Sequence, residues 1–171
     1  MAKKIARLDF DLAGCMELSK LLANVALDVQ AEVIGAAVAE AAKPVVRAIK
    51  RRVPVRYGNL KRSIMAVVRK KKKTGKAVAV VGPERGGRYK SGKRLNKKKD
   101  DLAGSDQPSR YAHLVEFGHK GRDGNRVAEK PFMRPGTTES MTEASGRMVV
   151  GFQKGLTKVL AKRVKKAMKT K

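Results

Sequence analysis

The first pattern along the chain is a run of apolar residues that recur at steps of three and four, between residues 16 and 52. This spacing places them on one face of a helix. The stripe consists of Leu18, Leu22, Val25, Val29 and Val33. Residues 31–42 are rich in alanine, the strongest helix former. Pro44 removes one helical hydrogen bond, so we expect a kink or a break there, and Pro54 ends the element.

The hydrophobic period changes after residues 57–59, whose Tyr-Gly-Asn sequence predicts a turn. Residues 63–69 and 77–81 are short runs rich in β-branched side chains, which is typical of strands. They predict an antiparallel hairpin with a basic tip. Burying several unpaired ammonium groups is prohibitive, so the tip lysines should face solvent or a polyanion. These lysines are Lys70, Lys71, Lys72 and Lys73.

Residues 83–109 show no hydrophobic period and are rich in glycine and basic side chains. We expect a long mobile loop. Loops of this length in compact domains are usually either functional or disordered, and both readings stay open. Its candidate partner or DNA contacts are Arg85, Arg88, Lys93, Arg94, Lys97, Lys98 and Lys99.

The last third of the chain predicts a long basic helix. Residues 111–117 fit a short helix or a strand, and Val127 is expected to begin a short strand. Residues before proline avoid the α region, so residues 131–135 form an extended turn, with Pro135 in the first turn of the helix. The stripe of that helix is Met141, Met148, Phe152, Leu156, Leu160, Val164 and Met168.

These patterns predict an α+β fold with a long N-terminal helical segment, a small antiparallel sheet and a basic C-terminal helix. We expect an N-terminal arm over residues 1–15 and a single domain over residues 16–171, including the mobile loop.

Charge points to the kind of partner. Lys and Arg number 41 against 15 Asp and Glu, a net charge of +26. Such a chain is attracted to polyanions or acidic surfaces. The basic runs at residues 69–76, 85–99 and 154–171 are candidate phosphate contacts, or simply solvated surfaces. Three Tyr, four Phe and no Trp are too few for a base-stacking platform. Non-specific nucleic-acid binding is therefore one candidate function.

The chain offers no convincing catalytic or metal site. Residues 87–93 match the start of a phosphate-binding loop, but Arg94 replaces the required Ser or Thr. His113, Glu116 and His119 share a spacing of three, but Gly118 should end the helix before the third ligand. Cys15 is the single cysteine and is expected to be a small buried hydrophobe. We predict no enzyme, cofactor, metal or membrane span, and synthesis in the cytosol.

Three segments in order carry a family resemblance: residues 53–64 (VPVRYGNLKRSI), 111–118 (YAHLVEFG) and 130–135 (KPFMRP). Together, with two strands between the first and second, they resemble the tail-component family of long-tailed bacteriophages. The matching framework positions are Pro54, Gly58, Leu60, Ser63, Tyr111, Glu116, Phe117, Gly118, Pro131, Phe132, Arg134 and Pro135.

The motifs make sense as framework. Gly58 would reverse the chain, and Glu116 would cap an element or pair with a cation. Phe132 would sit in the core and aim the last helix. The residues expected to pack under the sheet are Tyr111, Leu114, Val115 and Phe117.

The resemblance implies a structural protein of the phage neck that completes the tail or joins it to the head. It implies a homo-oligomeric ring around the DNA channel, with six copies favoured by the sixfold symmetry of such tails. Other neck and tail proteins would be partners, with contact to packaged double-stranded DNA. The location would be the virion, after assembly in the bacterial cytoplasm.

Overall fold

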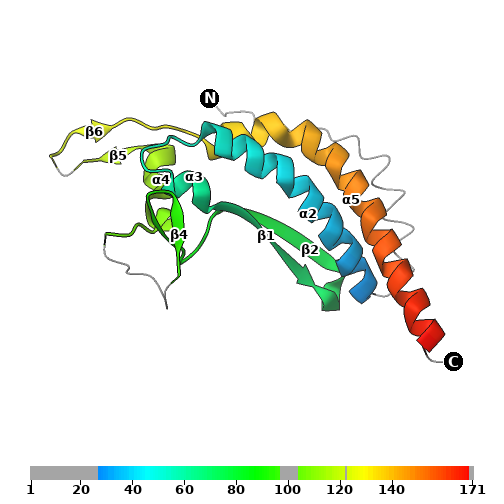
Figure 1. Cartoon of the computed structure of the whole chain (residues 1–171). Helices are drawn as coiled ribbons and strands as arrows, with labels where there is room; N and C mark the ends of the chain where they lie inside the picture. Colours follow the sequence, from blue (N-terminus) through cyan, green and yellow to red (C-terminus); the bar gives the residue numbers. More distant parts are fainter. Residues whose placement is uncertain (1–26, 97–103, 122, 170–171) are drawn as a thin grey trace.

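The computed structural model describes residues 27–96, 104–121 and 123–169 of the chain (Figure 1). The expected arm at residues 1–15, the helical pattern before Leu27, and Lys97 to Lys99 lie outside the described residues. The mixed α+β class predicted from the sequence is confirmed, with a long helix, a C-terminal helix and small antiparallel sheets of two strands each in place of the single sheet expected.

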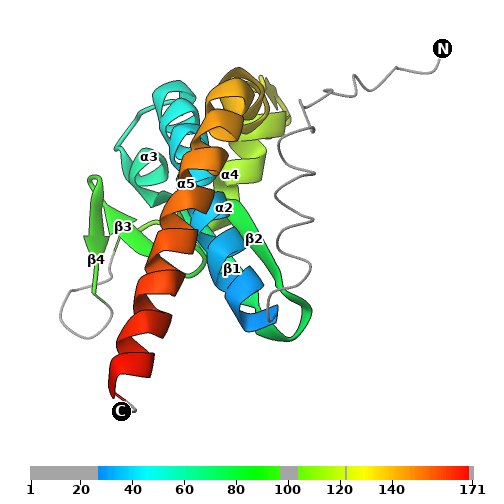
Figure 2. The same ribbon diagram turned by 90° about the vertical axis from the view of Figure 1, so that its right-hand side faces the viewer.

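Helix α2 (Leu27–Arg52) is the centre of the fold. Helix α5 (Met133–Lys169) runs antiparallel along one side of it, and the hairpin of β1 (Ile64–Lys71) and β2 (Lys76–Pro83) covers another side (Figures 1 and 2). Pro44 is fully buried, and α2 continues through it without a break. The break that the sequence allowed is therefore absent, because packing on both sides supports the helix.

Helices α2 and α5 approach so closely that glycine is required at their contacts. A Cβ on Gly151 would lie 2.8 Å from the Ala37 Cα, and one on Gly155 would lie 3.0 Å from the Val33 Cα. Farther along, a Cβ on Gly136 would lie 2.9 Å from the Ile49 Cα. Real Cβ atoms are not accommodated at such distances without a shift of the backbone.

Ion pairs border this helix seam on its exposed sides. The Arg52 Nε atom donates to Glu139 at 2.8 Å, and Lys162 lies 3.4 Å from Glu32. The Arg47–Glu143 pair is 3.4 Å long. Exposed pairs of this kind each contribute little to the free energy of unfolding.

The apolar stripe predicted for α5 is only partly correct. Phe152 is buried, and Leu156 packs against the same cluster on α2. Leu160, Val164 and Met168 are instead 61%, 54% and 76% exposed. The face that meets α2 is built largely from glycine and other small residues, which a search for large apolar side chains overlooks.

The predicted hairpin with a basic tip is present. Strands β1 and β2 pair antiparallel, from Ile64 opposite Pro83 to Lys71 opposite Lys76. The tip is a single 3-10 turn, η1 (Lys72–Thr74). One face of the hairpin covers α2, while the other face is exposed and carries Met65, Val67, Val78 and Val80.

The region expected to be a long mobile loop contains regular secondary structure where it is described. Strands β3 (Arg88–Lys90) and β4 (Lys93–Leu95) form a small hairpin. Tyr89 is buried, and its backbone exchanges two hydrogen bonds with Asp106. The sequence did not predict this hairpin, because one aromatic side chain and a few backbone bonds anchor the segment without any hydrophobic period.

Helix α4 (Pro108–Phe117) settles the choice between helix and strand. It ends at Gly118, and the chain then forms a short hairpin of β5 (His119–Lys120) and β6 (Arg126–Val127). Val127 therefore ends its strand and does not begin it. Phe117 is 59% exposed under the Arg134 guanidinium, so the expectation that it packs under the sheet was wrong.

Glu116 fixes the start of α5. Its buried carboxylate accepts backbone N–H bonds from Phe132 at 2.7 Å, Met133 at 2.9 Å and Arg134 at 3.1 Å. Burial raises the pKa of Glu116, but the three N–H groups and the Arg134 side chain outweigh it, so the pKa is lowered overall. Next to this cap Phe132 is fully buried in the core. The predicted capping role is thus what the structure contains.

The helix seam gives a first prediction. Gly151→Ala should lower the free energy of unfolding by about 1–2 kcal/mol, because the new methyl group meets backbone atoms of α2. Gly146→Ala is the matched control, because no atom lies within 4 Å of a Cβ there and the helix former should raise stability by up to about 1 kcal/mol. Urea unfolding checks both, and equal stabilisation by both changes would contradict the close packing.

The capping carboxylate gives a second prediction. Glu116→Gln should lower stability at pH 7 by about 1–2 kcal/mol, because the neutral amide interacts less well with the helix N-terminus. The lowered pKa means that the charged form stabilises the fold above the ordinary value of 4.5, and this stability is lost as the pH falls through the lower folded value. The difference between wild type and variant should therefore shrink in urea titrations at successively lower pH. A difference independent of pH would count against the charged cap.

Candidate functional site

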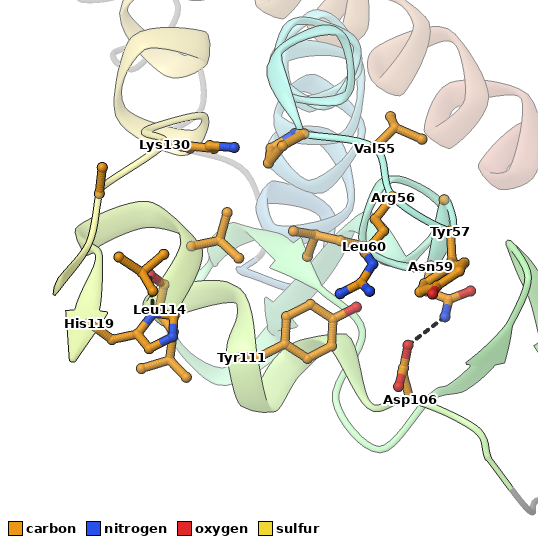
Figure 3. Close-up of a pocket in the computed structure, with 15 residues that line it drawn as sticks. Val55, Arg56, Tyr57, Asn59, Leu60, Asp106, Tyr111, Leu114, His119 and Lys130 are labelled. Atoms are coloured by element: carbon orange, nitrogen blue, oxygen red, sulfur yellow. Dashed lines mark hydrogen bonds between the residues drawn. The ribbon is translucent and has the colours of Figure 1, made fainter. Parts of the chain in front are cut away.

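A groove of about 490 Å³ lies where two of the motif segments meet. It is bounded by the turn before α3 (Asn59–Ser63), by α4, and by the chain that leaves β6 (Figure 3). Its walls are mainly apolar, from Pro54, Leu60, Tyr111, Leu114, Val115, Val127 and Ala128. Its polar lining side chains are Arg56, Asn59, Asp106, His119 and Lys130.

The first wall depends on the turn at Gly58. This glycine has φ of 75°, a left-handed conformation that side chains disfavour, and its carbonyl accepts the Arg62 N–H at 3.0 Å. The turn starts α3 and buries Leu60 in the core. The predicted reversal at Gly58 is therefore present.

Asn59 ties the residue 84–107 region to this wall. Its side-chain N–H donates to the Asp106 carboxylate at 2.7 Å (Figure 3). Its side-chain oxygen Oδ1 accepts the Gly92 backbone N–H at 2.6 Å. Asn59 is buried, so both bonds are partly shielded from solvent. One amide thereby holds two distant parts of the chain beside the groove.

Tyr111 lies in the middle of the groove, between His119 on one side and Asn59 with Asp106 on the other (Figure 3). Burial, followed by the nearby Asp106 charge, raises the pKa of Tyr111, so its hydroxyl stays protonated at neutral pH. The backbone N–H of Lys130 donates to the Val115 carbonyl at 2.9 Å, which holds this part of the chain against α4. The groove thus combines a rigid aromatic floor with cations at its edge.

A second network of polar side chains, partly exposed to solvent, joins Glu84 to the β3–β4 hairpin. The Glu84 carboxylate accepts two bonds from Arg94, at 2.6 and 2.8 Å, and one from the Tyr89 hydroxyl at 2.6 Å. Arg94, opposed by burial and aided by Tyr89, lowers the pKa of Glu84 to about 2. Burial together with Glu84 raises the pKa of Tyr89 to about 12. This arrangement ties Glu84 to the hairpin and keeps its carboxylate charged at neutral pH.

The candidate basic contacts fall into two separate places. Lys70 to Lys73 are exposed at the hairpin tip, far along β1 from the groove (Figure 1). Arg85 and Lys93 are exposed near β3 and β4. Arg94 is paired with Glu84, and Arg88 donates to the Ser105 hydroxyl at 3.1 Å. Two of the loop arginines therefore already serve the fold.

The residues weighed for metal and nucleotide chemistry do not assemble. Within the described ranges, no cluster of three potential metal ligands occurs. Glu116 caps α5, and His119 Nδ1 faces the Leu114 carbonyl at 3.4 Å. Residues 87–94 form the β3–β4 hairpin instead of a loop between a strand and a helix. No described helix is long and apolar enough to cross a membrane.

Sequence reasoning missed the groove itself and three of its polar residues, Arg56, Asn59 and Asp106. Two of these, Arg56 and Asn59, stand inside the first motif, so that motif was the available signal. No local sequence signal marks Asp106, because its partner Asn59 lies far away along the chain.

Comparison with known proteins identifies the family. Residues 17–118 match the family model described as "Bacteriophage HK97-gp10, putative tail-component". No curated protein and no solved structure matches the chain. The match covers more than half of the chain and includes the first two motifs. The chain therefore belongs to the HK97 gp10-like family of bacteriophage tail components and is a structural protein of the virion.

Proposed function

We propose that this protein completes the tail at the phage neck and joins it to the head, as one subunit of a ring around the DNA channel. The observation that carries the proposal is the convergence of two family motifs on one groove. The motif residues there are either buried framework or groove lining. A tail component needs such a surface to hold a neighbour in the virion.

The groove suits an acidic and apolar segment of another virion protein. Arg56 and Lys130 stand at its edge, so a partner with carboxylates gains complementary charge. A second copy of this chain is a poorer source of such an acidic segment, because its described glutamates are already engaged in ion pairs. Those glutamates are Glu32, Glu40, Glu84, Glu116, Glu129, Glu139 and Glu143.

Ring formation must overcome strong self-repulsion. Each subunit carries a net charge of +26, and like charges oppose close packing of identical subunits. Acidic neighbours in the virion, or DNA in the channel, relieve this repulsion. We infer that a closed ring of six copies forms on such a partner and not from isolated subunits in solution.

The role is tested by deleting the gene from the parent phage and imaging the lysate by electron microscopy. Filled heads beside separate or defective tails are expected. Normal infectious particles would contradict the role. They would favour the alternative, a basic protein that binds nucleic acid as a monomer.

The groove is tested by complementing the deleted phage with variants. Arg56→Glu should lower phage titre by about tenfold or more, because it reverses the charge at the groove edge without removing a core side chain. Arg110→Glu is the matched control, because Arg110 is exposed on α4, outside the groove, and should leave titre unchanged. Equal titres for the two variants, with equal thermal stability, would remove the groove from the proposal.

A further inference from the structure

Two basic segments that are far apart in sequence meet at one end of the molecule. Gly75 at the hairpin tip lies against the start of α2, where a Cβ would be 3.3 Å from the Leu27 side chain. The C-terminal half of α5 reaches the same part of α2, since Val159 shares a core cluster with Val29 and Lys162 pairs with Glu32. The tip and the end of α5 therefore flank the start of α2 (Figures 1 and 2).

Both segments present exposed lysines at this end. The tip lysines are Lys70, Lys71, Lys72, Lys73 and Lys76, and none forms an ion pair with a described residue. The α5 lysines are Lys158, Lys162 and Lys165, of which Lys162 pairs with Glu32. We call the two sets together the lysine end. Most of its charge is uncompensated within the described chain.

The type of side chain indicates which polyanion fits. Protein interfaces are enriched in aromatic residues and arginine and depleted in lysine, so a protein partner is a poor match for the tip. Residues 69–76 contain no aromatic side chain on which an unpaired base could stack. Flexible ammonium groups do suit phosphates, whose contacts carry no sequence information. Duplex DNA carries one such charge per about 1.7 Å of its axis.

The loop arginines are weaker candidates than the lysine end. Arg94 is held by two bonds to Glu84, and Arg88 by Ser105. Binding a phosphate would require these partners to be displaced or shared. The lysine end needs no such rearrangement, and it lies at the opposite end of the fold from the groove (Figure 1).

We propose that the lysine end binds the phosphate backbone of double-stranded DNA without sequence preference. This deepens the proposed function and rests on it for its place in the virion: the groove holds a protein neighbour while the lysine end faces the DNA that passes through the neck. Binding of duplex DNA by the lysine end does not depend on assembly of the virion, so it can be measured with the purified protein.

The experiment compares three variants of the full chain with wild type. Lys71, Lys72 and Lys73 are changed together to Gln, which keeps the side-chain stems, and Lys158, Lys162 and Lys165 are changed in a second variant. The matched control changes Lys61, Arg110 and Lys120 to Gln, which are exposed cations outside both the lysine end and the candidate contacts at residues 85–99. Fluorescence anisotropy measures binding to a DNA duplex of mixed sequence, to one isolated strand of that duplex, and to polyglutamate. Each is measured over a range of salt concentrations.

Each lysine-end triple should weaken duplex binding on the order of tenfold and reduce the slope of log K against log salt by about 2–3, since each phosphate contact contributes about 0.9. The control triple, with the same loss of charge, should change neither value by more than a small amount. Circular dichroism should show equal folding for all variants.

Each of the following results would overturn the DNA site: equal losses for the control triple, no loss for the lysine-end triples, or polyglutamate bound as tightly as duplex. The last result would assign the surface to an acidic protein, and tighter binding of the single strand would also exclude a duplex site. If purified protein fails to bind duplex while deletion of the gene still leaves unjoined heads and tails, the DNA site falls and the neck role stands.

Discussion

The buried carboxylate of Glu116 is the interaction on which the rest of the structure depends. It comes from the end of α4, in the second motif, and receives the first N–H groups of α5, in the third motif. It therefore fixes where α5 begins, beside the fully buried Phe132. From that start α5 runs antiparallel along α2, at a separation that only glycine permits at several contacts. The same α4 forms one wall of the groove, so a single cap links the helix seam to the groove.

Local sequence patterns predicted the elements whose side chains repeat with a clear period. The apolar period predicted α2 and the long final helix, Pro54 predicted the end of α2 near Arg52, and β-branched runs predicted the β1–β2 hairpin. The roles of Gly58 and Glu116 were predicted from the motifs. Features set by contacts distant in sequence were not. The Asn59–Asp106 bond and the burial of Tyr89 order a region that has no period of its own. The groove follows from those contacts, so no local pattern indicates it.

The two ends of the molecule differ in the chemistry they offer. The groove end has an apolar wall, a central tyrosine and a few cations, which suits a protein neighbour. The lysine end has flexible point charges, which suit phosphates. The helix seam keeps these ends apart, because α2 and α5 extend from one to the other (Figure 1). A subunit of this kind is suited to bridging a protein ring and the DNA within it.

The central claim is that the two ends of the subunit face different partners in the virion: DNA at the lysine end and a protein at the groove. The most direct measurement is a cryo-electron microscopy map of the neck in the assembled phage, at a resolution that distinguishes the hairpin tip from the groove. The account predicts that the lysine end points to the DNA in the channel and that the groove is filled by a segment of another virion protein. An empty groove with the lysine end on the outer surface would contradict it.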